Sequence, residues 1–210
     1  MIIDNTQNNL LKAYNMLLYF AGSMIMKEPT EECVIDFWTN GSLKKLPVRS
    51  SNPRFINAAS ILRQSCEDKD LCKTMLNEDH SRLFDKGGLQ HVPARESDYL
   101  INVTEKYHES PEEFYRSYGW QPESKSDIPA DHIGIELLFL TRLTDKYMQL
   151  DDEPSCREMR KEIRRFIENH LLSWIPQWNE NIQENAHTLC YKGIGTLIFA
   201  CVEDIYAILS

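Results

Sequence analysis

Residues 186–209, AHTLCYKGIGTLIFACVEDIYAIL, are apolar around most of the circumference of a helix. A helix without a single hydrophobic stripe is one that its neighbours cover on most sides. We therefore predict that this segment, from about Ala186 to Leu209, is the central buried helix of the fold. Gly193 and Gly195 lie inside it, where close packing of helices explains them better than phosphate binding.

Helical periodicity extends over most of the remaining chain. Stripes of apolar residues follow helix-start signals near residues 30, 52, 70, 110, 129 and 155, and no alternating strand pattern occurs. The 210 residues contain only 8 glycines and 9 prolines, which is typical of long helices. The sequence predicts an all-α, single-domain bundle of about nine or ten helices over residues 1–210, with a possible hinge in the polar segment 119–128.

The charge balance restricts the classes of partner. Against 23 Lys and Arg stand 32 Asp and Glu, a net charge of −9 that repels phosphate backbones and attracts basic peptides. We expect no nucleic-acid binding. The acid at Asp4 and the shortness of every uncharged run exclude a secretory signal and membrane insertion, so we expect a cytoplasmic protein.

The six cysteines include no Cys-x-x-Cys pair. Most lie among apolar residues at helical spacing, which predicts small buried side chains in a reducing compartment rather than zinc ligands. No glycine-rich phosphate loop or Gly-x-Ser-x-Gly elbow is present, and no residue pattern indicates a bound cofactor.

One metal site has to be weighed. Glu105 with His108, and Glu184 with His187, are both Glu-x-x-His pairs, the motif that di-iron carboxylate bundles carry on two helices. Glu136 could supply one further ligand. The segment around Glu105 shows no amphipathic helix, and a chain this rich in glutamate produces such pairs by chance, so we expect no metal and no catalytic residues.

Asp131 and His132 lie in the first turn of a helix that we expect to begin at Pro129. An acid at this position complements the helix dipole, and an Asp-His dipeptide alone is a weak sign of chemistry. The surrounding residues give it more weight.

The stretch 128–140, IPADHIGIELLFL, resembles the Pro-x-Asp-His-(Ile/Leu) signature of the TorD/DmsD family of cytoplasmic chaperones for molybdenum-containing anaerobic reductases. Four further segments are similar to family motifs in the family's order, namely residues 83–88, 93–99, 114–120 and 166–174. Arg95 departs from the family pattern, which has an aromatic residue there, and Ser173 replaces a proline. The resemblance runs from about residue 80 to the C-terminus.

The resemblance implies a TorD-like fold and a non-enzymatic role. Such a chaperone binds the twin-arginine leader, or the body, of a molybdoenzyme catalytic subunit, assists cofactor insertion and prevents premature export. Carried over from the matching motifs, the peptide-binding residues are Leu83, Phe84, Glu96, Tyr99, Asp131 and His132.

We expect apolar contacts from Leu83 and Phe84 and arginine pairing by Glu96 and Asp131. On periodicity alone, core packing explains Leu83 and Phe84 equally well. His132 either holds Asp131 in place or binds the peptide itself. Two other functions remain open, a di-iron bundle protein and a helical adaptor with an unrelated partner, and the chain could be a monomer or a domain-swapped homodimer.

Overall fold

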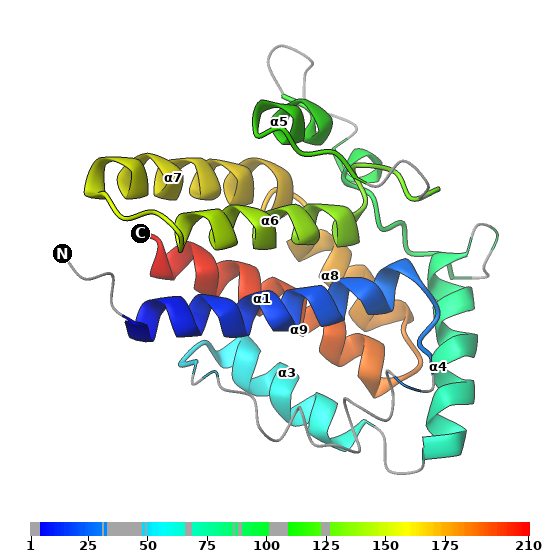
Figure 1. Ribbon diagram of the computed structural model, residues 1–210. Coiled ribbons are helices and arrows are strands. Elements are labelled where there is room, and N and C mark those ends of the chain that lie inside the picture. The colour runs from blue at the N-terminus through cyan, green and yellow to red at the C-terminus, as the bar shows by residue number, and fades with distance from the viewer. Residues whose placement is uncertain are drawn as a thin grey trace.

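The computed structural model describes residues 5–30, 32, 48, 50–65, 69–85, 87, 90–100, 109–122 and 127–210. In these ranges the chain forms eight α-helices and no β-strand, which confirms the all-α prediction with slightly fewer helices than expected (Figure 1). The helix predicted from residue 30 falls largely in 31–47, outside the described residues. The α-helices are α1 (Asn5–Met26), α3 (Pro53–Gln64), α4 (Lys69–Phe84), α5 (Pro111–Ser117), α6 (Ile133–Tyr147), α7 (Glu153–Phe166), α8 (Ile175–Asn185) and α9 (Leu189–Ile208).

Helix α9 lies at the centre, as its sequence predicts. It contacts α1, α3, α4 and α8, and thirteen of its residues are buried. The helix begins three residues later than expected because Thr188 caps it, its hydroxyl accepting a hydrogen bond from the amide of Tyr191. The buried apolar side chains form one core cluster around it.

The two glycines of α9 allow its neighbours to approach closely. A Cβ at Gly193 would lie 2.7 Å from Cγ of Leu62 on α3, and a Cβ at Gly195 would lie 3.0 Å from Ile182 on α8. The first distance is shorter than real Cβ contacts and the second is tighter than most of them, so the packing interpretation of these glycines is confirmed.

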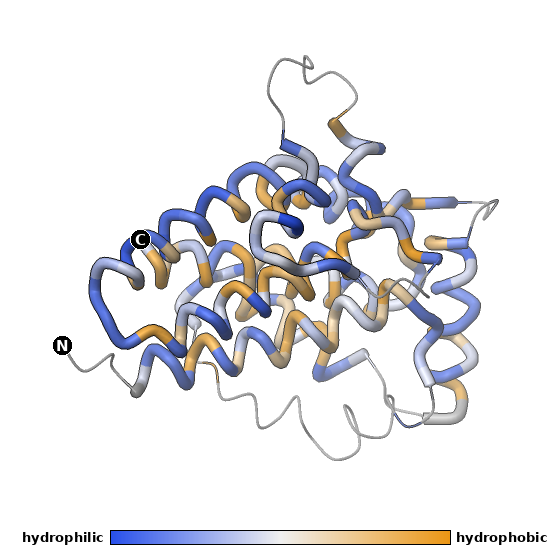
Figure 2. The backbone as a smooth tube through the Cα atoms, turned by 45° about the horizontal axis from the view of Figure 1, so that its top comes forward, coloured by the Kyte–Doolittle hydropathy of each residue, from blue (hydrophilic) through white to orange (hydrophobic). Residues whose placement is uncertain are grey.

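Helices α1 and α6 pair on one side of α9, and α7 packs against α6 (Figure 1). Hydrophobic and hydrophilic segments alternate along the tube of these outer helices, as expected of helices with one buried face (Figure 2). The first turn of α1 reaches the end of α9, where the Gln7 side chain donates a hydrogen bond to the carbonyl of Ile208.

A π-helical turn, η3 (Ile167–Leu171), continues α7 and directs the side chain of His170 into the core. Trp174 follows, and its indole Nε1 donates to the carbonyl of His170 at 2.6 Å. This turn supplies part of the site described below.

Three of the described cysteines, Cys156, Cys190 and Cys201, are free and buried, in agreement with the sequence. Cys72 is disulfide-bonded, so the expectation of reduced thiols is wrong for that residue. Among the described residues, no helix is both long and apolar enough to cross a bilayer.

Candidate functional site

A short antiparallel bridge between Arg95 and His132 joins the 90–100 loop to the residues just before α6. The amide of Ile133 donates to the carbonyl of Ala94 at 2.8 Å, and the amide of Glu96 donates to the carbonyl of Asp131 at 2.9 Å. The two segments that the sequence assigned to one peptide site are therefore fixed side by side.

This bridge corrects the predicted start of α6. The helix begins at Ile133 rather than Pro129, because the residues just before Ile133 form backbone hydrogen bonds with the 90–100 loop instead of continuing the helix. Asp131 thus precedes the helix, and His132 is its N-cap residue.

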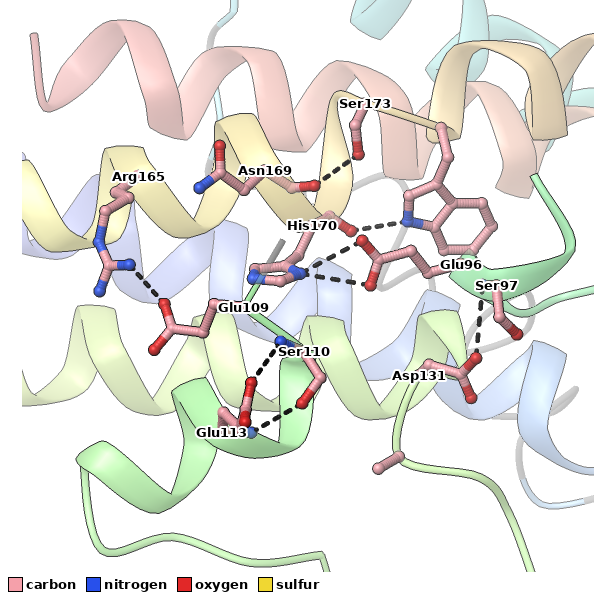
Figure 3. A network of polar contacts seen from close by, with 12 residues as sticks. Glu96, Ser97, Glu109, Ser110, Glu113, Asp131, Arg165, Asn169, His170 and Ser173 are labelled. Carbon is pink, nitrogen blue, oxygen red and sulfur yellow. Dashed lines mark hydrogen bonds and ion pairs between the residues drawn. The ribbon is translucent and has the colours of Figure 1, made fainter. Parts of the chain in front are cut away.

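Asp131 presents a half-buried carboxylate that two groups hold in place. Nε of Arg95 donates to Oδ1 at 3.0 Å, and the amide of Ser97 donates to Oδ2 at 3.4 Å (Figure 3 shows the second contact). Burial alone would raise the pKa of Asp131, but these hydrogen bonds outweigh it and hold that pKa below its usual range. The group is a carboxylate anion at neutral pH.

A cleft of about 440 Å³ opens beside this carboxylate. It lies between the 95–100 loop, the start of α5 and Asp131, and Leu100 and Pro111 give it apolar walls. The lining residues are Arg95, Glu96, Ser97, Leu100, Ser110, Pro111, Glu112 and Asp131. A cationic group with an apolar neighbour is the kind of ligand that this combination can bind.

His132 performs a structural task. Its ring Nδ1 accepts a hydrogen bond from the amide of Gly134 at 3.1 Å, which caps α6. Burial lowers the pKa of His132 to about 4, so the ring is neutral at pH 7 and Nδ1 is an acceptor. Of the two roles suggested for His132, holding Asp131 does not fit, since Arg95 and Ser97 hold that carboxylate.

Glu96 is one of the residues that line the cleft, but its carboxylate points toward His170 rather than into the cleft. Its side chain is buried, and both carboxylate oxygens lie 3.2 Å from Nδ1 of His170 (Figure 3). Glu136 is fully buried nearby; burial first, and then the charges of Glu96 and Asp131, raise its pKa far above the usual range. The arginine-pairing role predicted for Glu96 does not fit this buried position.

The remaining three predicted residues also pack inward. Leu83 is fully buried in the core, which favours its alternative interpretation, and Phe84 packs half-buried against His80 and Tyr191. The hydroxyl of Tyr99 donates to the carbonyl of Pro93 at 2.9 Å. The ring of Tyr99 packs against that of Trp174, with the two ring centroids 5.3 Å apart. None of these three residues lines the cleft.

Sequence reasoning missed the parts that Arg95, Ser97 and His170 play here. Arg95 carried a signal, because a cation stands where the resembling family has an aromatic residue. Ser97 acts through its backbone amide, which no side-chain pattern reveals. His170 lies in the 166–174 motif, and its partner Glu96 is 74 positions away in the sequence, so no local pattern pairs them.

The di-iron arrangement does not form in the part of the chain that the structure describes. Glu184 lies on α8, whereas His187 lies beyond its end, so the two side chains do not share one helical face. Glu105 and His108 fall outside the described residues. Within the described ranges, no three His, Cys, Asp or Glu side chains are grouped to hold a metal ion.

Comparisons with known proteins agree on one family. The family model for the nitrate reductase delta subunit matches residues 52–180. Proteins named chaperone protein TorD are 28% identical over 98 residues in Vibrio parahaemolyticus, 28% over 134 residues in Aliivibrio salmonicida and 24% over 209 residues in Vibrio vulnificus. These alignments cover 47%, 64% and 92% of this chain. They span 46%, 60% and 95% of the respective relatives, so the first two matches extend over about half of those proteins.

Proposed function

This chain belongs to the TorD/DmsD family of molybdoenzyme-maturation chaperones, which the nitrate reductase delta subunit model describes, and we propose that it binds the twin-arginine leader of a molybdenum oxidoreductase. It acts as a chaperone and not as an enzyme. By holding the catalytic subunit in the cytoplasm until its cofactor is inserted, it prevents premature export.

The observation that carries this proposal is the Asp131 carboxylate at the edge of the cleft. Its pKa lies below the usual range, so it is an anion at neutral pH and can pair with a basic ligand. An arginine side chain can bind a carboxylate through two parallel hydrogen bonds, which a lysine cannot do. A site built on this carboxylate therefore discriminates between the two cations.

Two further features support a basic leader with an apolar segment as the ligand. The net charge of −9 attracts a basic peptide from a distance and speeds its encounter with the protein. Leu100 and Pro111 in the cleft walls offer apolar contacts to the residues that flank the arginines.

The test is a calorimetric titration with a synthetic twin-arginine leader, compared with the same peptide carrying two lysines. We expect a micromolar or tighter dissociation constant for the arginine peptide, weaker binding of the lysine peptide, and a loss of affinity as salt increases. Asp131→Asn should weaken binding about 10- to 100-fold, because a hydrogen bond to a charged group contributes about 1.5–3 kcal/mol.

Asp151→Asn is the matched control, since it removes the same charge from an exposed position between α6 and α7. If both variants bind like the wild type, Asp131 is not the arginine site. If leaders from several molybdoenzymes all fail to bind, leader recognition is wrong, and a helical adaptor with another partner becomes the better description.

Retention of the catalytic subunit needs its own experiment. We expect the purified protein to capture the cofactor-free catalytic subunit and to release it after the cofactor has been loaded. Equal capture of both forms would contradict a role in maturation.

A further inference from the structure

Arg95 combines a fixed backbone with an accessible side chain. Its backbone pairs with His132, and the flanking residues Ala94 and Glu96 are hydrogen-bonded to Ile133 and Asp131. The Arg95 side chain is nevertheless 46% exposed, whereas that of Asp131 is only 16% exposed. The contact with the carboxylate is therefore made by the exposed side chain and is separate from the backbone hydrogen bonds that fix the loop.

The contact that Arg95 makes is an incomplete version of an arginine–carboxylate pair. The hydrogen bond to Oδ1 of Asp131 comes from Nε, at 3.0 Å. Oδ2 receives the backbone amide of Ser97 at the longer distance of 3.4 Å. A guanidinium that approaches end-on from the cleft can use two parallel N–H groups, which is the stronger geometry.

We propose that Arg95 is an internal competitor of the client's arginine, so that it weakens leader binding. This inference rests on the proposed function, because it describes the same carboxylate. Arg95 leaves Asp131 when a bidentate arginine replaces it. A lysine, which makes a single point contact, binds the same carboxylate more weakly, and the need to displace Arg95 lowers both affinities by the same factor.

The charge on Asp131 makes such a competitor useful. In the free protein the Arg95 guanidinium compensates the negative charge of the Asp131 carboxylate. Other cations, such as lysine side chains or metal ions, therefore bind this carboxylate weakly. Leader binding then exchanges one ion pair for another, so its salt dependence is smaller than that of a new ion pair.

The first experiment compares Arg95→Gln with the wild type in the leader titration. We expect the variant to bind the arginine peptide about two- to fivefold more tightly, to depend more steeply on salt, and to keep the wild-type preference for the arginine peptide over the lysine peptide. Arg95→Lys, which keeps a cation beside Asp131, should stay closer to the wild type. Affinity in Arg95→Gln that equals or falls below the wild-type value would overturn the proposal.

Arg116→Gln is the matched control. Arg116 is exposed on α5, the helix whose first residues line the cleft, so its replacement removes the same charge from the same region. If Arg116→Gln increases affinity as much as Arg95→Gln does, the gain is a general effect of charge, and the proposal fails.

A second measurement separates this proposal from leader recognition. Argininamide is titrated at millimolar concentration while the amide resonance of Ser97 is followed by NMR. We expect the resonance to shift at a lower argininamide concentration in Arg95→Gln than in the wild type, and not to shift in Arg95→Gln combined with Asp131→Asn. A shift without any leader binding would keep the role of Arg95 and reject the proposed function. Leader binding with neither a shift nor a gain in affinity in Arg95→Gln would keep the proposed function and reject the role of Arg95. If neither a shift nor leader binding is observed, both proposals are rejected.

Discussion

Both carboxylate oxygens of Glu96 lie 3.2 Å from Nδ1 of His170, although 74 positions separate the two residues. Glu96 belongs to the short 3-10 helix η2 (Glu96–Asp98), next to the carboxylate site, and His170 belongs to the π-helical turn after α7. Both side chains are almost inaccessible to solvent. The pair therefore ties the loop that carries Arg95 and Ser97 to the core.

Removing one partner of this pair should destabilise the protein strongly. Glu96→Ala leaves the imidazole Nδ1 buried without its carboxylate, at a cost of about 3 kcal/mol in the free energy of unfolding. Urea denaturation followed by tryptophan fluorescence measures the loss. Glu112→Ala is the control, since Glu112 is exposed in the same cleft. Equal losses in the two variants would show that the Glu96–His170 contact contributes nothing.

Glu136 should make stability fall as pH rises. Its pKa is raised far above 4.5 by burial and by the charges of Glu96 and Asp131, so the native state keeps a proton that the unfolded state loses above pH 4.5. Because the native state then binds more protons, the free energy of unfolding decreases with pH over that range, by up to about 1.4 kcal/mol per unit.

Glu136→Gln tests this directly, since the amide resembles a carboxylic acid that cannot ionise. We expect the free energy of unfolding of the variant, relative to the wild type, to increase with pH above 4.5. Stability curves that run parallel for the two proteins would mean that Glu136 does not hold an extra proton in the native state.

Local signals in the sequence identify elements, whereas the site depends on contacts that they cannot specify. The apolar residues of α9 and its glycines are local features, and they correctly predict a buried central helix with close neighbours. Pro129 is also a local signal, but it misplaces the start of α6, because the amide of Ile133 pairs with Ala94, far back in the sequence.

The same limit applies to the charged residues. Glu96 stands in a polar loop and resembles a surface ligand, and only its contact with His170 shows that it is buried. Arg95 and Asp131 are 36 positions apart, and neither sequence nor helical periodicity pairs them. The motifs that resemble the TorD/DmsD family brought the right segments together, without indicating which side chains face the solvent.

Replacing His132 should affect the stability of α6. His132→Ala removes the acceptor for the amide of Gly134 and should cost about 1 kcal/mol, whereas His132→Asn retains a capping side chain and should cost less. Chemical denaturation at neutral pH distinguishes the two variants. Equal losses would mean that the cap contributes little.

The pKa of His132 adds a test by pH. It is lowered from 6.5 to about 4 by burial, so the unfolded state takes up a proton at a higher pH than the native state does. The contribution of His132 to stability is therefore complete above pH 6.5 and decreases as the pH falls toward 4. His132→Asn should lack this decrease, which would appear as a smaller stability difference from the wild type at about pH 5 than at about pH 7.5. A difference that is constant with pH would contradict the lowered pKa.

Asp79 on α4 should be one of the most important polar residues for the attachment of α4 to α9. Its buried carboxylate accepts the amide and the hydroxyl of Thr188, both at 2.7 Å, together with the amide of His187 at 3.1 Å, and it also pairs with Arg82. An anion at this position satisfies backbone donors at the start of α9 and complements the positive end of its dipole.

Asp79→Asn turns an amide group toward these donors and should cost about 3 kcal/mol in the free energy of unfolding. Asp85→Asn, at the exposed end of α4, should change it by about 0.5 kcal/mol or less. Hydrogen exchange gives the local readout: the amide of Tyr191, which donates to the hydroxyl of Thr188, should exchange faster in Asp79→Asn and unchanged in Asp85→Asn. If the two variants unfold and exchange alike, the Asp79 carboxylate does not anchor α9 to α4.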